Sequence, residues 1–171
     1  KLLKLEARPN QTHQTLAQIE QEKGHLTIIT QNADGLHQRA GSKNVLEIHG
    51  SIYKNTCMDC GKPYPVEYVA YHDRVPRCSC GGIIRPGIVL FDEIPDLAII
   101  QKASRAISQA DLLIIGGTSL ALSSARSLLR PFHGAHLVIL NEDPTPLDDQ
   151  ADLVIHQKLG EVFGQISPVA Y

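Results

Sequence analysis

The stretch LLIIGGTS at residues 112–119 decides the fold that we expect for this chain. Four apolar residues run directly into two glycines and two hydroxyl side chains, as in a buried parallel strand that ends in a functional loop. Small residues at a strand end let the backbone approach a phosphate or a ribose closely, and hydroxyl groups can donate to it. Gly117, Thr118 and Ser119 are therefore candidates for nucleotide contact.

Apolar runs of similar length recur on both sides of this stretch. We expect strands at residues 26–30, 45–48, 88–91, 112–115, 137–140 and 153–155. Segments of helical length lie between several of them, and we expect helices at residues 10–24, 96–109 and 122–129. Such alternation is the signature of βαβ units. It predicts an α/β fold with a Rossmann-like, doubly wound parallel sheet.

Residues 51–85 differ in composition from the rest of the chain and are rich in cysteine, glycine, proline and tyrosine. They hold too few aliphatic side chains for a core of their own, so this segment needs a covalent or metal staple. We expect a small zinc-binding domain here, inserted into a Rossmann-like domain made of residues 1–50 and 86–171.

All four cysteines lie in this insert. Cys57 and Cys60 have two residues between them, Cys78 and Cys80 have one, and 17 residues separate the pairs. Four thiolates at such a spacing predict a tetrahedral structural zinc, which leaves no position for water and does no chemistry. Buried or redox-active cysteines are the alternative, because the second pair has one intervening residue where two are commoner.

Composition disfavours two classes of partner. Lys and Arg number 16 against 18 Asp and Glu, a formal charge of -2, so the chain has no basic field for nonspecific binding of nucleic acid. No apolar run approaches the roughly 20 residues that cross a bilayer. The clustered cysteines indicate a reducing compartment, and we expect a soluble, cytoplasmic protein that is monomeric.

Ligands of a parallel sheet bind outside the carboxyl ends of its strands. Four polar groups follow expected strands, at residues 31–35 (QNADG), 49–50 (HG), 116–119 (GGTS) and 141–142 (NE). Each also has a plain explanation, as a turn, a structural histidine or an ordinary connection. Their joint order along the chain favours function.

In order and spacing, these motifs resemble the sirtuin family, in its bacterial type. The resemblance runs from Pro9 to Val162 and rests on TQNADGLHQRAGS at 30–42, LEIHGS at 46–51, the cysteine pairs, RPGIVLFDE at 85–93, GGTSL at 116–120 and LNEDPTPLDD at 140–149. It implies a Rossmann-like domain with a zinc-bearing insert. It also implies an NAD-dependent protein lysine deacetylase or deacylase, which transfers the acyl group to ADP-ribose.

The resemblance assigns roles residue by residue. His49 matches the catalytic histidine, and Asn32 and Asp34 join it, with Asp34 poised to bind the nicotinamide carboxamide. Contacts with NAD are implied for Gln31, Asn32, Asp34, Gly117, Thr118, Ser119, Asn141, Glu161 and Val162. Contacts with the acylated lysine peptide are implied for Val89, Phe91, Asp92, Glu93 and Leu122.

These residue types suit the chemistry. An amide oxygen is a poor nucleophile, so a polar pocket must loosen the bond between nicotinamide and ribose before that oxygen attacks. Gln31, Asn32 and Asp34 would supply the pocket. The 2'-hydroxyl of the ribose then needs a base that titrates near neutrality, as histidines do, and His49 fits this role.

The chain departs from the sirtuin pattern at several places. Ala33 stands where isoleucine is usual, Asp92 replaces a glycine, and Leu-Ser-Ser at 122–124 replaces a V-x-P run, so the acyl-chain preference stays open. No GAGxS loop precedes Lys1. A sheet without that central strand would expose edge amides, so we expect the segment to belong to the protein, and a protein that starts at Lys1 to turn over no NAD.

Two other functions remain open. A protein mono-ADP-ribosyltransferase would share the first chemical step, and a non-catalytic module would bind NAD or ADP-ribose with vestigial catalytic residues. The set of Gln31, Asn32, Asp34 and His49 argues for deacylation over both.

Overall fold

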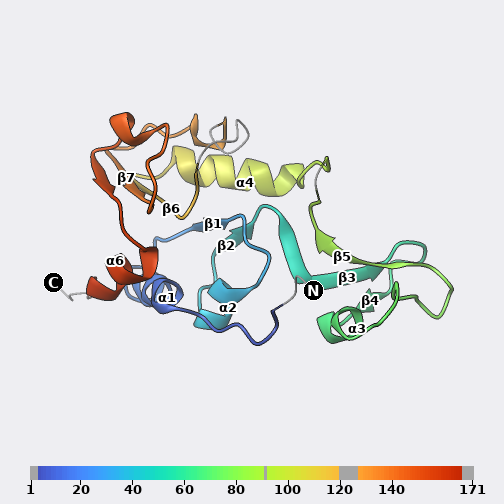
Figure 1. The fold of residues 1–171 in the computed structure, drawn as a ribbon. Coiled ribbons are helices and arrows are strands. Elements are labelled where there is room, and N and C mark those ends of the chain that lie inside the picture. The colour runs from blue at the N-terminus through green and yellow to red at the C-terminus, as the bar shows by residue number, and fades with distance from the viewer. Residues whose placement is uncertain (1–3, 91, 120–126, 167–171) are drawn as a thin grey trace.

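Two short parallel strands lie near the centre of the molecule (Figure 1). The computed structural model describes residues 4–90, 92–119 and 127–166. Strand β1 (Ile28–Thr30) pairs with β2 (Val45–Glu47), so that Thr30 lies opposite Glu47. The strands expected at 26–30 and 45–48 are confirmed, although each is shorter than its apolar run. Their parallel direction brings both carboxyl ends to one edge.

Helices lie on both sides of this pair (Figure 1). Helix α1 (Gln11–Lys23) begins at the N-cap Asn10, whose side chain accepts from the backbone N–H of His13, and it ends at Gly24 with a positive φ of 74°. Both ends are as expected from the preferences of asparagine and glycine. Helix α2 (Leu36–Ala40), which the sequence reasoning missed, packs on α1. Helix α4 (Leu97–Ser108) contacts β2 and confirms the helix expected at 96–109.

A second parallel sheet has the order β6-β7-β8. Its strands β6 (Leu112–Gly116), β7 (His136–Leu140) and β8 (Leu153–Ile155) confirm the three later expected strands. Ile115 and Ile139 lie opposite each other and form its buried core. A short 3-10 helix, η1 (Asp148–Gln150), precedes β8, and helix α6 (Leu159–Gln165) packs back on α1.

The other face of this sheet is open to solvent. Leu112, Ile114 and Leu153 are 50%, 42% and 50% exposed, whereas the strands of a parallel sheet are ordinarily covered on both faces. Residues 120–126 of the helix expected at 122–129 lie outside the described part of the chain, and residues 127–129 are helical.

The cysteine-rich segment forms an antiparallel sheet with the order β4-β3-β5 and projects to one side (Figure 1). Its elements are β3 (Gly50–Cys57), β4 (Pro63–Tyr64), helix α3 (Val66–Ala70) and β5 (Ile84–Ile88). The expectation of a main-sheet strand at 88–91 was wrong. β5 pairs with β3 and ends at Ile88, because backbone pairing and not apolar content decides which sheet a segment joins. The domain boundary at 51–85 stays a prediction.

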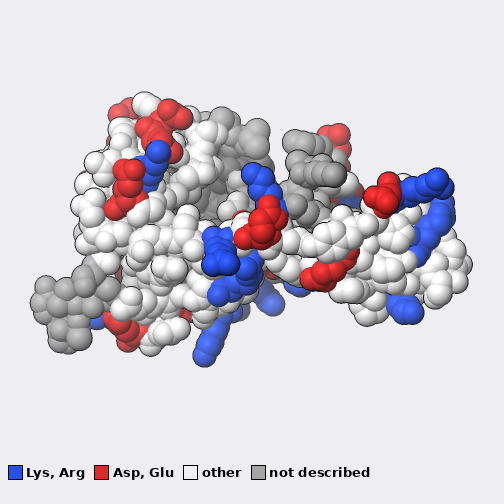
Figure 2. All heavy atoms as spheres, turned by 60° about the horizontal axis from the view of Figure 1, so that its bottom comes forward, with Lys and Arg blue, Asp and Glu red and all other residues white. Residues whose placement is uncertain are grey.

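Charges of both signs lie over the face that Figure 2 shows, in keeping with a formal net charge of -2. Within the described residues, no helix has the length and apolar character needed to span a membrane.

Two histidines join α1 to α2. The rings of His13 and His37 lie with their centroids 4.5 Å apart, and Nδ1 of His13 lies 2.6 Å from Oδ1 of Asn10. Nδ1 of His37 is buried without a hydrogen-bond partner among the described residues. Burial lowers the pKa of both imidazoles, the neighbouring His13 lowers that of His37 further, and the Asp34 carboxylate opposes both shifts.

We predict that this pair makes the fold sensitive to mild acid. Because the folded pKa values lie below those of the unfolded chain, the stabilisation is complete above about pH 6.5 and is lost as the pH falls through the folded values. His37→Phe keeps a ring against His13 and should reduce the loss of Tm between about pH 7 and pH 5 by a few degrees, as followed by circular dichroism. The exposed His25→Phe is the control, and an equal loss of Tm in His37→Phe and the unaltered protein would contradict the prediction.

Candidate functional site

The loop after β1 and the end of β2 lie at the same edge of the strand pair. The backbone N–H of Ile48 donates to the carbonyl of Thr30 over 3.0 Å, and that of Ile52 donates to the carbonyl of Ala33 over 3.0 Å. The Thr30 hydroxyl also accepts from the N–H of Asn32 over 3.0 Å. Gln31 and Asn32 therefore sit beside the segment that carries His49, as the sequence predicted from the parallel strand order.

Asp34 is half-buried at the start of α2. One of its carboxylate oxygens accepts from the backbone N–H of Leu36 over 3.0 Å, which fixes the side chain at the helix end. The next residue, Gly35, has a φ of 66°, and a Cβ there would lie 2.9 Å from the ring of Tyr53. Tyr53 thus packs directly on the turn that carries Asp34. Sequence reasoning missed it, because nothing local links Gly35 to Tyr53.

His49 is half-buried, and its ring makes no hydrogen bond or ion pair with the described residues. Its backbone is held firmly, since its carbonyl accepts from the N–H of Val89 over 2.9 Å. Gly50 turns the chain with a φ of 77°, and any Cβ there would lie 2.0 Å from the carbonyl oxygen of Gly87. An imidazole without a structural partner is free to take a proton from a substrate. This argues against the plain explanation of His49 as a hydrogen-bonded structural histidine.

The segment after β5 brings Val89 beside His49. The carboxylate of Glu93 is bound by the Arg85 guanidinium and by the N–H of Leu90, the latter over 2.9 Å. The Leu90 amide, followed by Arg85, lowers the pKa of Glu93. Glu93 therefore holds its own loop closed, and this use of its carboxylate was not foreseen.

Asp92 is exposed and has a positive φ of 66°, the conformation that favours glycine. Asparagine and aspartate tolerate it better than other residues, so the replacement of the usual glycine by aspartate is accommodated. Phe91 and Leu122, the other two residues expected to contact the peptide, lie outside the described residues.

Gly117 and Asn141 line one hollow of about 190 Å³, at the carboxyl ends of β6 and β7. The other lining residues are Leu140, Glu142, Asp143, Gln157 and Leu159. Gly117 has a φ of 63°, and a Cβ there would lie 2.8 Å from Leu159. The glycines of the GGTS loop thus make room for a side chain of α6.

The chemistry of this hollow suits a sugar or a base. Among the described residues, its lining includes two carboxylates, Glu142 and Asp143, and no cationic side chain. These residues offer acceptors for hydroxyl groups more readily than partners for a phosphate. Glu161 and Val162, for which contacts with NAD are expected, lie on α6 but not in this lining. Leu159, the first residue of the same helix, does line it, and the roles of Glu161 and Val162 stay predictions.

The four cysteine sulfurs come together in the projecting lobe. All lie within 4.8 Å of one another, and Cys57 with Cys80, Cys60 with Cys78, and Cys60 with Cys80 are each 3.5 Å apart. Four sulfurs placed about 2.3 Å from a tetrahedral zinc would lie about 3.8 Å apart, whereas a disulfide needs about 2.05 Å. The geometry therefore fits zinc and not a disulfide.

Electrostatics within the cluster also fits a cation. The backbone amide of Cys80 and the Tyr64 hydroxyl lower the pKa of Cys78 to about 5, which favours its thiolate. The amide of Gly82 favours a thiolate at Cys80 as well, but the neighbouring sulfurs outweigh it and raise the pKa of Cys80 to about 12. Several thiolates this close repel one another until a metal ion neutralises them.

Gly82 makes the space for this cluster, and we predict that it cannot be enlarged. A Cβ at Gly82 would lie 2.7 Å from Sγ of Cys57 and 2.7 Å from Oδ2 of Asp59. Gly82→Ala should therefore weaken zinc binding by about tenfold or more, measured by chelator competition with a colorimetric dye. Met58→Ala, at a 62% exposed side chain between the ligands Cys57 and Cys60, should bind zinc normally. Equal zinc affinity in the two variants would contradict the crowding argument.

Fold and site together define a class: an α/β nucleotide-binding protein of Rossmann type, with a projecting lobe whose four cysteines are placed to bind a metal ion. The Sir2 family model matches residues 1–124. This match covers most of the chain, and the chain belongs to the Sir2 family.

Curated relatives agree with this. An NAD-dependent protein deacetylase of Clostridium acetobutylicum is 49% identical over 165 residues, which are 95% of this chain and 67% of the relative. An NAD-dependent protein deacetylase of Cutibacterium acnes is 49% identical over 161 residues, covering 94% of this chain and 66% of the relative. The chain therefore spans about two thirds of the length of these relatives.

Solved structures show the same fold. Sir2 with a p53 peptide and NAD+ superposes with a TM-score of 0.85 at 39% identity, covering 94% of this chain and 70% of that one. Sir2 with the inhibitor EX-527, 2'-O-acetyl-ADP-ribose and deacetylated p53 peptide gives 0.86 at 40% identity, covering 94% and 71%. The Rossmann-like α/β fold expected from the sequence is confirmed.

Proposed function

We propose that this chain forms the larger part of an NAD-dependent protein lysine deacetylase. The reaction consumes NAD, an acetylated lysine and water, and yields nicotinamide, free lysine and O-acetyl-ADP-ribose. The observation that carries the proposal is the position of His49, whose ring has no partner among the described residues and whose segment is hydrogen-bonded to the strand that leads into the QNAD loop. The names of the Sir2 relatives and their complexes with NAD and peptide support it.

The chain's own residues divide the work. Gln31, Asn32 and Asp34 form the polar wall that holds the nicotinamide end of the substrate, and α2 fixes the Asp34 carboxylate. Oriented polar groups of this kind stabilise the positive charge as it moves from the nicotinamide ring to the ribose. His49 accepts the proton of the ribose 2'-hydroxyl and later returns it to a leaving group. Thr118, Ser119 and Asn141 hold the adenosine half, with Gly117 allowing close approach.

The peptide substrate would lie along the segment after β5. Val89 is fixed beside His49 by a backbone hydrogen bond of 2.9 Å, so an extended peptide there would present its acylated lysine to the base. We assign Phe91, Asp92 and Leu122 to the same surface, and Glu93 to closing the loop through Arg85. The acyl group preferred beyond acetyl stays open.

Zinc serves structure in this proposal. Cys57, Cys60, Cys78 and Cys80 would hold the ion and join the two ends of the lobe, which otherwise has a core of only a few buried side chains. The need to keep four cysteines reduced supports a cytoplasmic location, and we propose a monomer.

The first test is a deacetylation assay on the full-length protein with NAD and an acetylated peptide. We expect nicotinamide and deacetylated peptide in equal amounts, and a loss of peptide deacetylation of about a hundredfold or more in His49→Ala, as for removal of a general base. The exposed His25→Ala should behave as the unaltered protein.

The products separate the alternatives. Nicotinamide without deacetylated peptide would overturn the proposal in favour of ADP-ribosyl transfer to protein, detectable as a mass increase on the acceptor. Neither product, with ADP-ribose still bound, would instead assign a non-catalytic binding module.

A further inference from the structure

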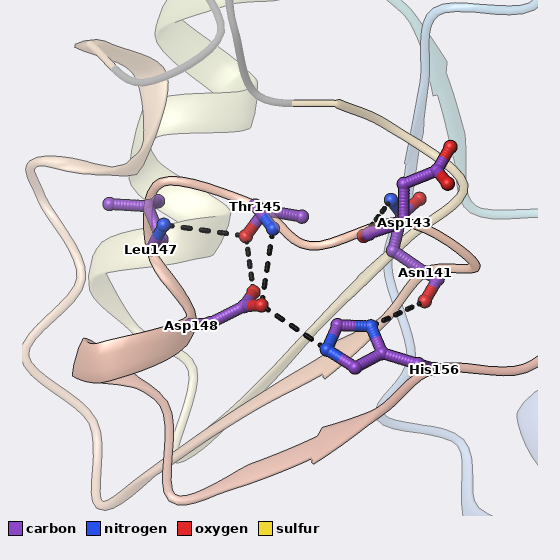
Figure 3. Close-up of polar contacts among 6 residues, drawn as sticks. All are labelled: Asn141, Asp143, Thr145, Leu147, Asp148 and His156. Atoms are coloured by element: carbon purple, nitrogen blue, oxygen red, sulfur yellow. Dashed lines mark hydrogen bonds and ion pairs between the residues drawn. The ribbon is translucent and has the colours of Figure 1, made fainter.

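A histidine outside the candidate site holds the backbone of a residue inside it. His156 follows β8, and its Nδ1 lies 3.0 Å from the carbonyl oxygen of Asn141. The backbone N–H of Asn141 donates to the carbonyl of Ile155 over 3.2 Å. Two successive residues at the end of β8 therefore bind both peptide groups of Asn141. Figure 3 shows the imidazole between Asn141 and Asp148.

The far side of the imidazole rests on an anchored carboxylate. Nε2 of His156 lies 3.4 Å from Oδ2 of Asp148. The buried Thr145 donates to that carboxylate twice, from its hydroxyl over 2.5 Å and from its backbone N–H over 3.1 Å. The Thr145 hydroxyl is also the main cause of the lowered pKa of Asp148, helped by its amide and by the charge of His156 and opposed by burial. Asp148 is thus a fixed anion.

The groups on either side of the His156 ring are the carbonyl oxygen of Asn141 and the carboxylate of Asp148. A carbonyl oxygen and an ionised carboxylate can only accept hydrogen bonds. Both ring nitrogens of His156 face acceptors, and Nδ1, 3.0 Å from the carbonyl oxygen of Asn141, makes the closer contact. The imidazole thus forms a clamp between the Asp148 carboxylate and the peptide of Asn141.

The clamp acts on the part of the hollow that the loop after β7 forms. Asn141 lines the hollow together with Gly117, and its side-chain amide donates to the carbonyl of Asp143 over 2.7 Å. A tilt of the Asn141 peptide would therefore move its side chain and the two carboxylates that follow it. His156 itself does not line the hollow.

We propose that His156, held by Asp148, is a positioning residue for the nucleotide: it fixes Asn141 and so sets the affinity for the adenosine half of NAD. This inference rests on the proposed function. The residue takes no part in the chemistry, so binding of NAD should depend on it while the rate of the bound complex should not.

The simple alternative is a surface ion pair with no functional effect. His156 is 42% exposed at its side chain and Asp148 21%, and exposed pairs contribute about 0–1 kcal/mol to stability. In that case His156→Ala would change the Tm slightly and leave the kinetics alone. The two explanations therefore differ in the KM for NAD.

The test uses the full-length protein and steady-state kinetics with NAD and an acetylated peptide. His156→Ala should raise the KM for NAD by about three- to tenfold, the range for one lost hydrogen bond, with kcat and the KM for peptide unchanged. Calorimetry with ADP-ribose should show the same loss of affinity. His136→Ala is the matched control, because His136 is exposed and lies at the opposite end of β7 from Asn141.

A double-mutant cycle tests whether the two residues act together. Asp148→Asn should raise the KM for NAD less than His156→Ala does, and the double variant should be no worse than His156→Ala alone. An unchanged KM for NAD in His156→Ala would overturn the inference while the proposed function stands. A fall in both kcat and Tm in that variant would do the same, because it would indicate a general structural defect. An unaltered protein that neither binds ADP-ribose nor deacetylates peptide would overturn both.

Discussion

The parallel pairing of β1 with β2 is the constraint on which the candidate site depends. Parallel strands point their carboxyl ends the same way, so the loop after Thr30 and the turn after Glu47 must meet. The hydrogen bond from Ile48 to the Thr30 carbonyl extends this pairing by one residue. Had the strands been antiparallel, the QNAD loop and His49 would lie at opposite ends. No side-chain contact is needed to explain their proximity.

Close approach of backbones is the second requirement, and glycine meets it at both halves of the site. Gly50 leaves no room for a Cβ against Gly87, which lets the chain pass from β2 into the zinc-binding lobe directly after His49. A Cβ at Gly117 would crowd Leu159, so glycine here lets α6 approach the end of β6. The lobe and α6 are thereby tied to the site at points where a larger residue would force them apart.

Three of the contacts that shape the site are polar: Arg85 with Glu93, Asp34 with the start of α2, and His156 between Asp148 and Asn141. Each fixes a loop by a charged group and backbone atoms. Loops have few apolar contacts to hold them, so charge-assisted hydrogen bonds supply the rigidity that binding and catalysis require. The zinc-binding cysteines do the same for a lobe with too small a core.

The sequence alone determined the features that depend on chain neighbours. These include the cap at Asn10, the apolar runs of β6, β7 and β8, the cysteine ligand set, and the polar residues at strand ends, because propensity, periodicity and ligand spacing are local. Only the tertiary structure decided that residues 84–88 join the lobe and that Tyr53 packs on Gly35. It alone placed Leu159 in the hollow and His156 on the Asn141 peptide. Those contacts depend on which distant segments meet, and no local pattern records that.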